Sequence, residues 1–554
     1  MRGFGLRRVL FSILIGGALA TPATEAAPGD RHVFASAVRS GVTHPLWMAM
    51  APDGAHVYVV SRHKQNTNRD LLVLQRDPTT GQLGNAQLFP VDSRHVRLAV
   101  SGDGAHLYAT RQSSLDVYAR DILTGAITLL ETHVNGGGGV TGLGTAIEIA
   151  LSPDDANVYV ASHGDDGIAV FARDPGTGLL AFLESHRDGV GGVDGLEQAA
   201  SVLVSPDGAH VYVGGRNTDG IGAFARSAVD GRLTFVQHYQ HPVANSSQSQ
   251  WLAMPADGGQ LYVARSDAVM TVLTRDAGTG ALALLEEHAL NSGPRAAAVS
   301  ASGEYVYAAA NDSLFVFRRD AIAGTLAFLE QLDGGAGGGD WLNDVYDLVV
   351  APDAEHVYAG GFWGDAVTQF RPLAIECSAI PAGGCRTPVK TTGSRLVVKQ
   401  GSSDAKDQIT FKWGSGEATD VADFGDPVST LDDYALCIYD GSPGTPLLTE
   451  AVMRAAGGCP TKPCWKATSK GPKFRDKARL PHGVIGLKLK AGTAGTAVLI
   501  TKLKGERTPT PFLPATVPLT VQVQTAHGAC WEAVFATALV NSTELFKSIL
   551  VTGP

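Results

Sequence analysis

Residues 30–373 alternate between apolar and polar side chains in short runs separated by glycine-rich turns. Residues 168–173, Ile-Ala-Val-Phe-Ala-Arg, are one such run, and the turn after it carries Thr177-Gly178. Alternation with a period of two places successive side chains on opposite faces of a β-strand, whereas a helix requires a period of about 3.6. The pattern therefore predicts many short strands and excludes a helical solenoid.

One segment of this pattern recurs along the chain. Residues 52–59, Pro-Asp-Gly-Ala-His-Val-Tyr-Val, return unchanged as residues 206–213, and five weaker copies keep a turn followed by a tyrosine. Each unit contains an apolar strand, this turn, the Val-Tyr-Val strand, an alternating strand, and a fourth strand after a Thr-Gly or Asp-Gly turn. Four strands in a repeat of about 40–50 residues are typical of a propeller blade. The seven repeat tyrosines are Tyr58, Tyr108, Tyr159, Tyr212, Tyr262, Tyr307 and Tyr358.

The seventh unit ends after Phe370 without a fourth strand of its own. Residues 34–41 match the end of the third unit in the spacing of Phe182, Arg187 and Gly189. We therefore expect an N-terminal strand, residues 32–40, to complete the last blade of a propeller that spans residues 30–373. Such closure covers a sheet edge that would otherwise be open for pairing with other chains.

The repeat, seen most fully in residues 205–213 (Ser-Pro-Asp-Gly-Ala-His-Val-Tyr-Val), resembles that of the lactonase-type seven-bladed propellers. This family includes 6-phosphogluconolactonase and muconate-lactonising enzymes, and the repeat is also similar to that of surface-layer propellers with Tyr-Val-Thr-Asn units. The resemblance implies the fold, and it implies lactone hydrolysis as one activity. The matching residues form turns and strands that every such blade needs, so no catalytic residue is carried over.

Composition changes near Leu373, which indicates a domain boundary. Lys64 is the only lysine before this point and fourteen follow it. From Glu376 onward, 20 Lys and Arg oppose 15 Asp and Glu, a net of +5, so the rest of the −10 chain carries −15. Alternation in residues 485–490 and 519–524 predicts half-buried antiparallel strands. We expect a smaller, sandwich-like all-β domain over residues 376–554, whose basic run between Lys462 and Arg479 is more typical of a solvated strand face than of contact with an anionic wall polymer.

The start of the chain predicts export. Three arginines precede the apolar run Val9–Ala20, which is too short for a membrane anchor. We expect residues 1–26 to be a signal peptide and the mature protein to be secreted, periplasmic or on the cell surface, with no membrane span. In an oxidising compartment the six cysteines favour three disulfides, and the sequence does not determine which cysteines pair. A zinc site is a minor alternative. The six cysteines are Cys377, Cys385, Cys437, Cys459, Cys464 and Cys530.

Aligning the units reveals a column of variable residues five positions before each turn's proline position. It reads Trp47, Arg97, Glu148, Ser201, Trp251, Ala296 and Asp347, and the next column is apolar. Inner strands line a propeller's channel, so we expect the variable column near the channel mouth, where a carboxylate beside an arginine could poise a water for attack on a lactone. Alternatively, these groups pair with one another and hydrate the channel. The ligand-binding candidates are Arg97, Glu148, Asp347, Trp47, Trp251, His44, His95 and Arg295.

The remaining motifs exclude several function classes. The chain has no Gly-x-Ser-x-Gly elbow, zincin motif, Walker loop or EF-hand, and its net charge of −10 argues against nucleic-acid binding. Gly137–Gly142 matches Gly-x-Gly-x-x-Gly but joins two predicted strands, so it presents no helix N-terminus to a pyrophosphate. We expect no cofactor and no metal. Two hypotheses remain. The first is a secreted or surface scaffold whose propeller face binds a small polar ligand, a glycan or a protein; the second is a lactone hydrolase acting outside the cytoplasm.

Overall fold

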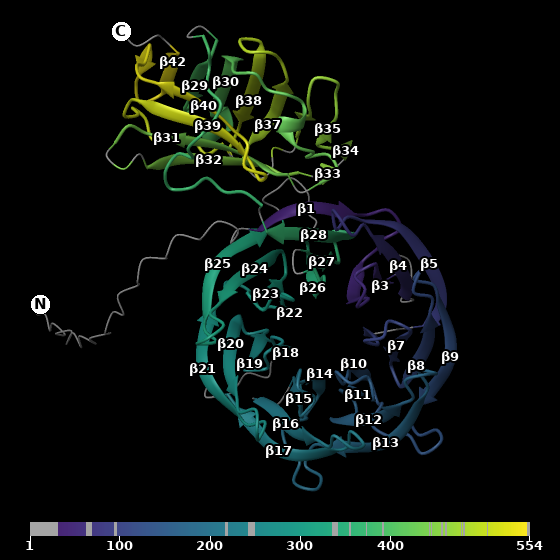
Figure 1. Cartoon of the computed structure of the whole chain (residues 1–554). Coiled ribbons are helices and arrows are strands. Elements are labelled where there is room, and N and C mark those ends of the chain that lie inside the picture. Colours follow the sequence, from purple (N-terminus) through teal and green to yellow (C-terminus); the bar gives the residue numbers. More distant parts are fainter. Residues whose placement is uncertain are drawn as a thin grey trace, which may run out of the picture.

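The computed structural model describes residues 32–550, except 63–68, 94–96, 217–219, 242–249, 335–341, 354–355, 373, 391–392, 431, 443, 445, 456–457, 460–461, 478, 480–481 and 507. The proposed signal peptide, residues 1–26, and His95 lie outside the described residues. Seven four-stranded antiparallel sheets form a ring, and a second body of sheets follows it (Figure 1). The predicted all-β class, a seven-bladed propeller followed by a disulfide-bearing β-domain, is confirmed.

Blades 1 to 4 follow one another in the chain, each running from an inner to an outer strand. Blade 1 contains β2 (Pro45–Met50), β3 (His56–Arg62), β4 (Arg69–Arg76) and β5 (Leu83–Ser93). Blade 2 contains β6 (Leu98–Val100), β7 (His106–Arg111), β8 (Ser114–Arg120) and β9 (Ile127–Val134). Blade 3 contains β10 (Ala146–Leu151), β11 (Asn157–Ser162), β12 (Gly167–Arg173) and β13 (Leu180–Arg187). Blade 4 contains β14 (Ala199–Val204), β15 (His210–Gly215), β16 (Gly220–Arg226) and β17 (Leu233–Gln240).

Blades 5 to 7 complete the ring, and the last one takes its outer strand from the N-terminal side of the chain. Blade 5 contains β18 (Gln250–Ala253), β19 (Gln260–Arg265), β20 (Val269–Arg275) and β21 (Leu282–Ala289). Blade 6 contains β22 (Ala296–Val299), β23 (Tyr305–Ala310), β24 (Ser313–Arg319) and β25 (Leu326–Asp333). Blade 7 contains β26 (Val345–Val350), β27 (Val357–Gly361), β28 (Ala366–Pro372) and β1 (His32–Val38). β1 pairs antiparallel with β28, from His32 opposite Pro372 to Val38 opposite Val367.

A repeated hydrogen-bond network joins neighbouring blades and explains the tyrosine and aspartate of the repeat. At the junction of blades 1 and 2, Arg120 donates to the Tyr58 hydroxyl (2.7 Å) and to the carboxylate of Asp53 (3.0 Å). Burial raises the pKa of Tyr58 to about 12, so the neutral hydroxyl donates in turn to the Gly125 carbonyl (2.8 Å). Five other junctions repeat these contacts through Arg173, Arg226, Arg275, Arg319 and Arg76.

The junction of blades 6 and 7 departs from this pattern. Ser302 stands at the aspartate position, and by strand register Pro372 stands at the arginine position. The hydroxyl of Tyr307 instead lies 2.9 Å from Nε2 of His32, which belongs to β1. The junction at which the ring closes has therefore lost the arginine and aspartate that the six other junctions use.

The C-terminal domain packs two sheets face to face. One has eight strands in the order β35-β36-β37-β38-β30-β29-β42-β41, and the other four in the order β32-β31-β39-β40. Their inner faces enclose a core that includes Trp413, Trp531 and Tyr434. The strands are β29 (Arg395–Lys399), β30 (Gln408–Gly416), β31 (Tyr434–Tyr439), β32 (Leu447–Met453), β35 (Trp465–Lys466), β36 (Lys473–Phe474), β37 (Val484–Lys490), β38 (Ala497–Lys504), β39 (Leu519–Thr525), β40 (Cys530–Phe535), β41 (Val540–Asn541) and β42 (Leu545–Ile549), with a hairpin of β33 (Gly458–Cys459) and β34 (Lys462–Pro463). Short 3-10 helices span Asp404–Lys406 and Ala422–Phe424.

Two disulfides with described partners tie the segment after the ring to this domain. Cys377 pairs with Cys437 in β31, and Cys385 pairs with Cys530 in β40. Cys464 is also disulfide-bonded, whereas the side chain of Cys459 lies outside the described residues. Two of the three expected disulfides are thus seen with both partners, and both lie after the propeller.

A buried ion pair connects the propeller to the C-terminal domain. Nη1 of Arg371, in β28, donates to Oδ2 of Asp433 (2.8 Å), and its Nη2 donates to Oδ1 (2.5 Å). The side chains are 2% and 0% exposed. The Asp433 carboxylate also accepts the backbone N–H groups of Ala374 (3.0 Å) and Ala455 (2.6 Å). This carboxylate is therefore fully satisfied, and its partners come from both parts of the chain.

A second cation lies beside this ion pair. Arg454 is buried, and its guanidinium lies 5.1 Å from the ring centre of Phe34 in β1. Burial lowers the pKa of Arg454 to about 10, and the nearby charge of Asp476 opposes that shift. The C-terminal domain thus contacts the propeller at the blade that closes the ring.

Candidate functional site

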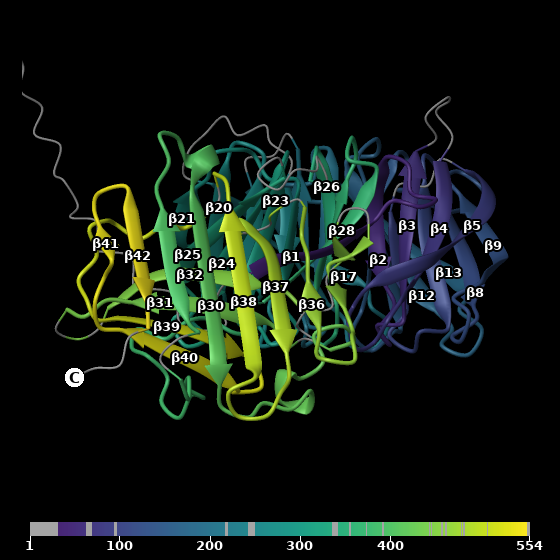
Figure 2. The same cartoon turned by 90° about the horizontal axis from the view of Figure 1, so that it is seen from above.

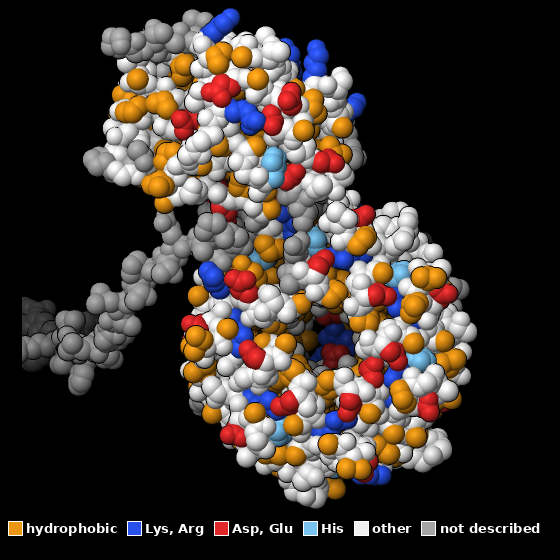
Figure 3. Space-filling view, in the orientation of Figure 1, with side chains coloured by type: hydrophobic (Ala, Val, Ile, Leu, Met, Phe, Trp, Pro, Cys, Tyr) orange, Lys and Arg blue, Asp and Glu red, His pale blue; other side chains and the backbone are white. Residues whose placement is uncertain are grey.

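Three charged residues, from blades 2, 3 and 7, meet in the central channel. Arg97, directly before β6, places Nε 3.0 Å from Oε2 of Glu148 in β10 and Nη1 3.1 Å from Oδ2 of Asp347 in β26. The Arg97 guanidinium also lies 5.5 Å from the ring centre of Trp47. Blue and red side chains are visible within the central hollow of the ring (Figure 3). The sequence column thus contributes one cation and two carboxylates to a single cluster.

The electrostatics of this cluster follow from its burial. The side chains of Arg97, Glu148 and Asp347 are 8%, 19% and 12% exposed. Desolvation raises the pKa of Glu148 to about 7; Arg97 opposes that shift and Asp347 adds to it. Desolvation also raises the pKa of Asp347, which accepts the Met48 N–H (2.8 Å). Near neutral pH, Glu148 therefore exchanges a proton inside the channel.

A second arginine, Arg216, stands near this cluster. Arg216 directly follows β15, and its N–H donates to the carbonyl of Gln198 (3.1 Å), directly before β14. Its side chain is exposed, yet desolvation by the surrounding protein and then the charge of Arg97 lower its pKa. Arg216 is thus reached by water although the surrounding protein partly desolvates it. Both properties fit a position at the mouth of the channel. No carboxylate among the described residues pairs with it.

Sequence reasoning missed Arg216, although the repeat contains a signal for it. Arg216 is the fourth residue after the repeat tyrosine Tyr212. The same position in other blades also donates its N–H to the residue just before an inner strand, as in blades 1, 3 and 7. This column therefore surrounds one mouth of the channel. It reads Arg62, Gln112, His163, Arg216, Ser266, Asn311 and Phe362.

The candidates His44 and Arg295 lie in an aromatic cluster on the rim of blades 6, 7 and 1. The ring centre of His44 lies 4.6 Å from Phe362 and 5.2 Å from Trp363, whose side chain is well exposed. Arg295 lies over the ring of Tyr346 (4.7 Å). The remaining candidate, Trp251, packs against the core between blades 5 and 6. The structure thus places four of the eight candidates in the channel, two on the rim and one against the core, and the eighth, His95, lies outside the described residues.

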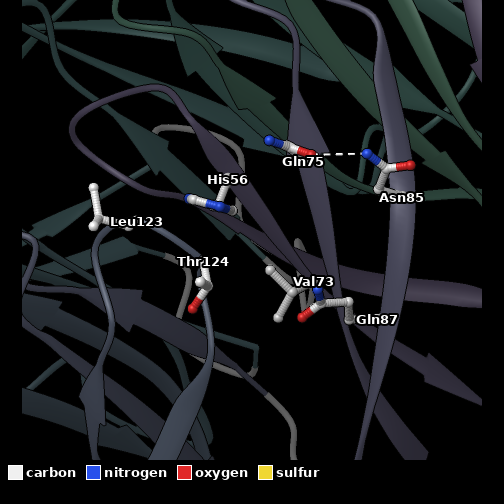
Figure 4. Close-up of a pocket in the computed structure, with 7 residues that line it drawn as sticks. All are labelled: His56, Val73, Gln75, Asn85, Gln87, Leu123 and Thr124. Carbon is white, nitrogen blue, oxygen red and sulfur yellow. Dashed lines mark hydrogen bonds between the residues drawn. The ribbon is translucent and has the colours of Figure 1, made fainter.

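A small pocket of about 200 Å³ lies between blades 1 and 2, and none of the charged cluster is among its lining residues (Figure 4). Gln75 accepts a hydrogen bond from Asn85 (2.8 Å), and Gln87, Thr124 and Leu123 line the opening. His56 also lines this pocket, but its Nδ1 lies 3.0 Å from Nη2 of Arg120 in the interblade network. The pocket therefore shares a structural residue with the ring and contains no charged lining group.

The described part of the chain shows no candidate metal site and no candidate membrane-spanning helix. No group of three or more His, Cys, Asp or Glu residues there is arranged to hold a metal ion. In the same part, no helix is long and apolar enough to cross a membrane.

Glu148 makes the stability of the ring depend on pH. Its pKa is about 7 in the folded state, against a usual value near 4.5, so between these values the folded state retains a proton that the unfolded state releases. The free energy of unfolding should therefore fall as pH rises from about 4.5 to 7, by on the order of a few kcal/mol. Urea unfolding at pH 5 and pH 8 measures this. Glu148→Gln should flatten the profile and Glu304→Gln, on the surface, should not; equal profiles for Glu148→Gln and the parent would refute the assignment.

Comparison with known proteins supports the fold assignment. A family model described as lactonase, 7-bladed beta-propeller, matches residues 90–190, 185–244 and 239–338, less than half of the chain. No curated protein sequence matches the chain. A periplasmic gluconolactonase from Pseudomonas aeruginosa is 22% identical, with a TM-score of 0.44, over 52% of this chain and 85% of its own.

Two further solved structures share the same level of similarity. A putative 6-phosphogluconolactonase from Bacteroides uniformis is 20% identical, with a TM-score of 0.43, over 52% of this chain and 84% of its own. Hydrazine synthase from Kuenenia stuttgartiensis is 18% identical, with a TM-score of 0.45, over 60% of this chain and 97% of its own. None of these similarities identifies an activity. The propeller of this chain is similar to the lactonase seven-bladed β-propellers that this family model describes.

Proposed function

We propose that the propeller binds a small polar ligand with an anionic group at the channel mouth, and that it does so outside the cytoplasm. The observation that carries the proposal is Arg216, an exposed guanidinium with no acidic partner among the described residues and a second arginine nearby. Two like charges held close together cost free energy, and a bound anion would relieve that cost. A planar guanidinium also suits carboxylate and phosphate groups, because it can donate two parallel hydrogen bonds.

The rim supports the same interpretation. Phe362 occupies the position of Arg216 in blade 7, and the exposed Trp363 follows it. The mouth therefore combines cationic and aromatic side chains, a combination that suits a ligand with an acid group and C–H groups that can pack on an aromatic ring. The disulfides support a location in an oxidising compartment. A secreted or surface-displayed binding protein is the function that these features favour.

The test is a binding experiment with gluconate and 6-phosphogluconate by titration calorimetry. Arg216→Gln should weaken the binding of either anion by about tenfold or more, since a hydrogen bond to a charged group contributes about 1.5–3 kcal/mol. The matched control is Arg318→Gln, which removes an exposed arginine that pairs with Glu304 (3.3 Å) in blade 6. Equal affinities of Arg216→Gln and the parent protein would rule out this site.

Lactone hydrolysis is the second candidate function, and Glu148 is the observation that favours it. A carboxylate with a pKa of about 7 in a channel can act as a general base at neutral pH, and Arg97 can stabilise an oxyanion. Hydrolysis of a lactone panel that includes 6-phosphogluconolactone should then rise with pH to a plateau above about 7. Glu148→Gln should lower kcat by about a hundredfold or more. No turnover of any lactone by the parent protein would leave ligand binding as the function.

A further inference from the structure

The C-terminal domain presents a sheet face of one charge. Its eight-stranded sheet turns alternate residues inward, where Leu487, Leu499 and Phe411 are buried in the core. The other face points away from the ring and toward the viewer in Figure 2. Lys and Arg side chains project along this edge of the domain in Figure 3. The basic residues on this outer face are Arg395, Lys399, Lys412, Lys466, Lys473, Lys488, Lys490, Lys502, Lys504 and Lys547.

These ten residues are half of the 20 basic residues that follow Glu376, and none of the 15 acidic residues in that region lies on the strands of this sheet. They come from seven strands spread over residues 395–547, so the sequence does not show them as a cluster. Of the basic run between Lys462 and Arg479, only Lys466 and Lys473 belong to this face. The remainder of the face is assembled by strand register.

Strand register places like charges directly opposite each other. Lys466 pairs with Lys473, Lys473 with Lys488, and Lys412 with Arg395. Like charges at such positions destabilise a sheet. The described residues form no ion pair with any of these side chains that would offset the repulsion. A fold that needed only solubility would mix both signs on such a face.

We infer that this face binds a linear anionic polysaccharide, one that carries carboxylate or sulfate groups. Neighbouring strands lie about 4.8 Å apart, so a row of cations across the strands offers a closely spaced charge to a chain laid over them. One such row runs through Lys466, Lys473 and Lys488 and continues past Ile500 to Lys412 and Arg395. A long anionic polymer that bridges these rows would convert the repulsion between them into binding energy.

Two other polyanions fit the face less well. A sheet of eight strands twists by about 20–25° per strand, so a flat membrane surface contacts only part of it, whereas a flexible chain can follow the twist. Nucleic-acid recognition favours arginine over lysine, and single strands also stack their bases on aromatic side chains. This face has one arginine among its ten cations, and no aromatic side chain points outward from its strands. A polysaccharide is therefore the occupant that the geometry favours.

The experiment measures binding of the full-length mature protein to polygalacturonate, with neutral dextran as the comparison. The face variant combines Lys412→Gln, Lys473→Gln and Lys488→Gln. The matched control combines Lys390→Gln, Lys406→Gln and Lys477→Gln, three exposed lysines off this face. Both variants change the net charge equally. We expect the face variant to lose about tenfold or more in affinity and to show a shallower salt dependence, whereas the control stays within about threefold of the parent.

Melting temperature provides a second measurement. Because the face variant removes like-charge pairs, its melting temperature should equal or exceed that of the parent. Equal losses of affinity in the two variants, or equal binding to dextran, would overturn the inference. Tighter binding to phosphatidylglycerol vesicles or to duplex DNA than to polygalacturonate at the same salt concentration would also overturn it, since the partner would then belong to another class.

Discussion

Asp433→Ala is expected to lower the free energy of unfolding by about 3–5 kcal/mol, because it leaves the buried guanidinium of Arg371 without a counter-ion. The substitution also removes the acceptor for the N–H groups of Ala374 and Ala455. Urea unfolding followed by circular dichroism measures the loss. Since the pair joins the propeller to the C-terminal domain, the two parts should also separate more readily, which limited proteolysis would detect.

Two variants test whether the charge pair itself is responsible. Arg371→Met combined with Asp433→Asn removes both charges and keeps an acceptor for the backbone, so it should recover more than half of the loss. Asp423→Ala breaks the partly exposed pair with Arg386 (2.9 Å) and should cost about 0–1 kcal/mol. If Asp433→Ala costs no more than Asp423→Ala, the interdomain pair is not a stabilising contact.

Arg97→Met is expected to have a similarly large effect, about 3–5 kcal/mol at pH 8, and a smaller one at pH 5. Without Arg97, two carboxylates remain in the channel with no cation beside them, and their pKa values rise further. At pH 5 the folded state can neutralise the two carboxylates by binding protons. At pH 8 it must either keep them charged in the channel or bind protons at a higher cost in free energy. The loss of stability should therefore grow with pH.

Neutralising the acids separates this explanation from simple loss of packing. Adding Glu148→Gln and Asp347→Asn to Arg97→Met should restore most of the stability at pH 8. Denaturant unfolding at the two pH values measures both effects. A loss that is independent of pH, and that the two amides do not reverse, would show that Arg97 acts through packing.

The sequence by itself determined the propeller. Alternation and the spacing of residues such as Tyr58 and Tyr212 are local properties of the sequence. In blades 1 to 6 the four strands are consecutive in the chain, so each blade can be predicted from its own segment. The same alignment predicted a variable column containing Arg97, Glu148 and Asp347 in the channel. The distribution of lysines along the chain also predicted where the basic second domain begins. Composition can be read without knowing which strands pair with which.

Only the tertiary structure decided which of these residues meet. Arg97 contacts residues from blades 3 and 7 because ring closure brings distant strands around one channel. Arg371 finds Asp433 because a second domain packs on the closing blade. The cationic face arises from the register of seven strands, and a shift of one residue in any strand would turn its lysines inward. Such contacts form between segments that are far apart in the chain. Local periodicity depends only on neighbouring residues, so it cannot show which distant segments pair.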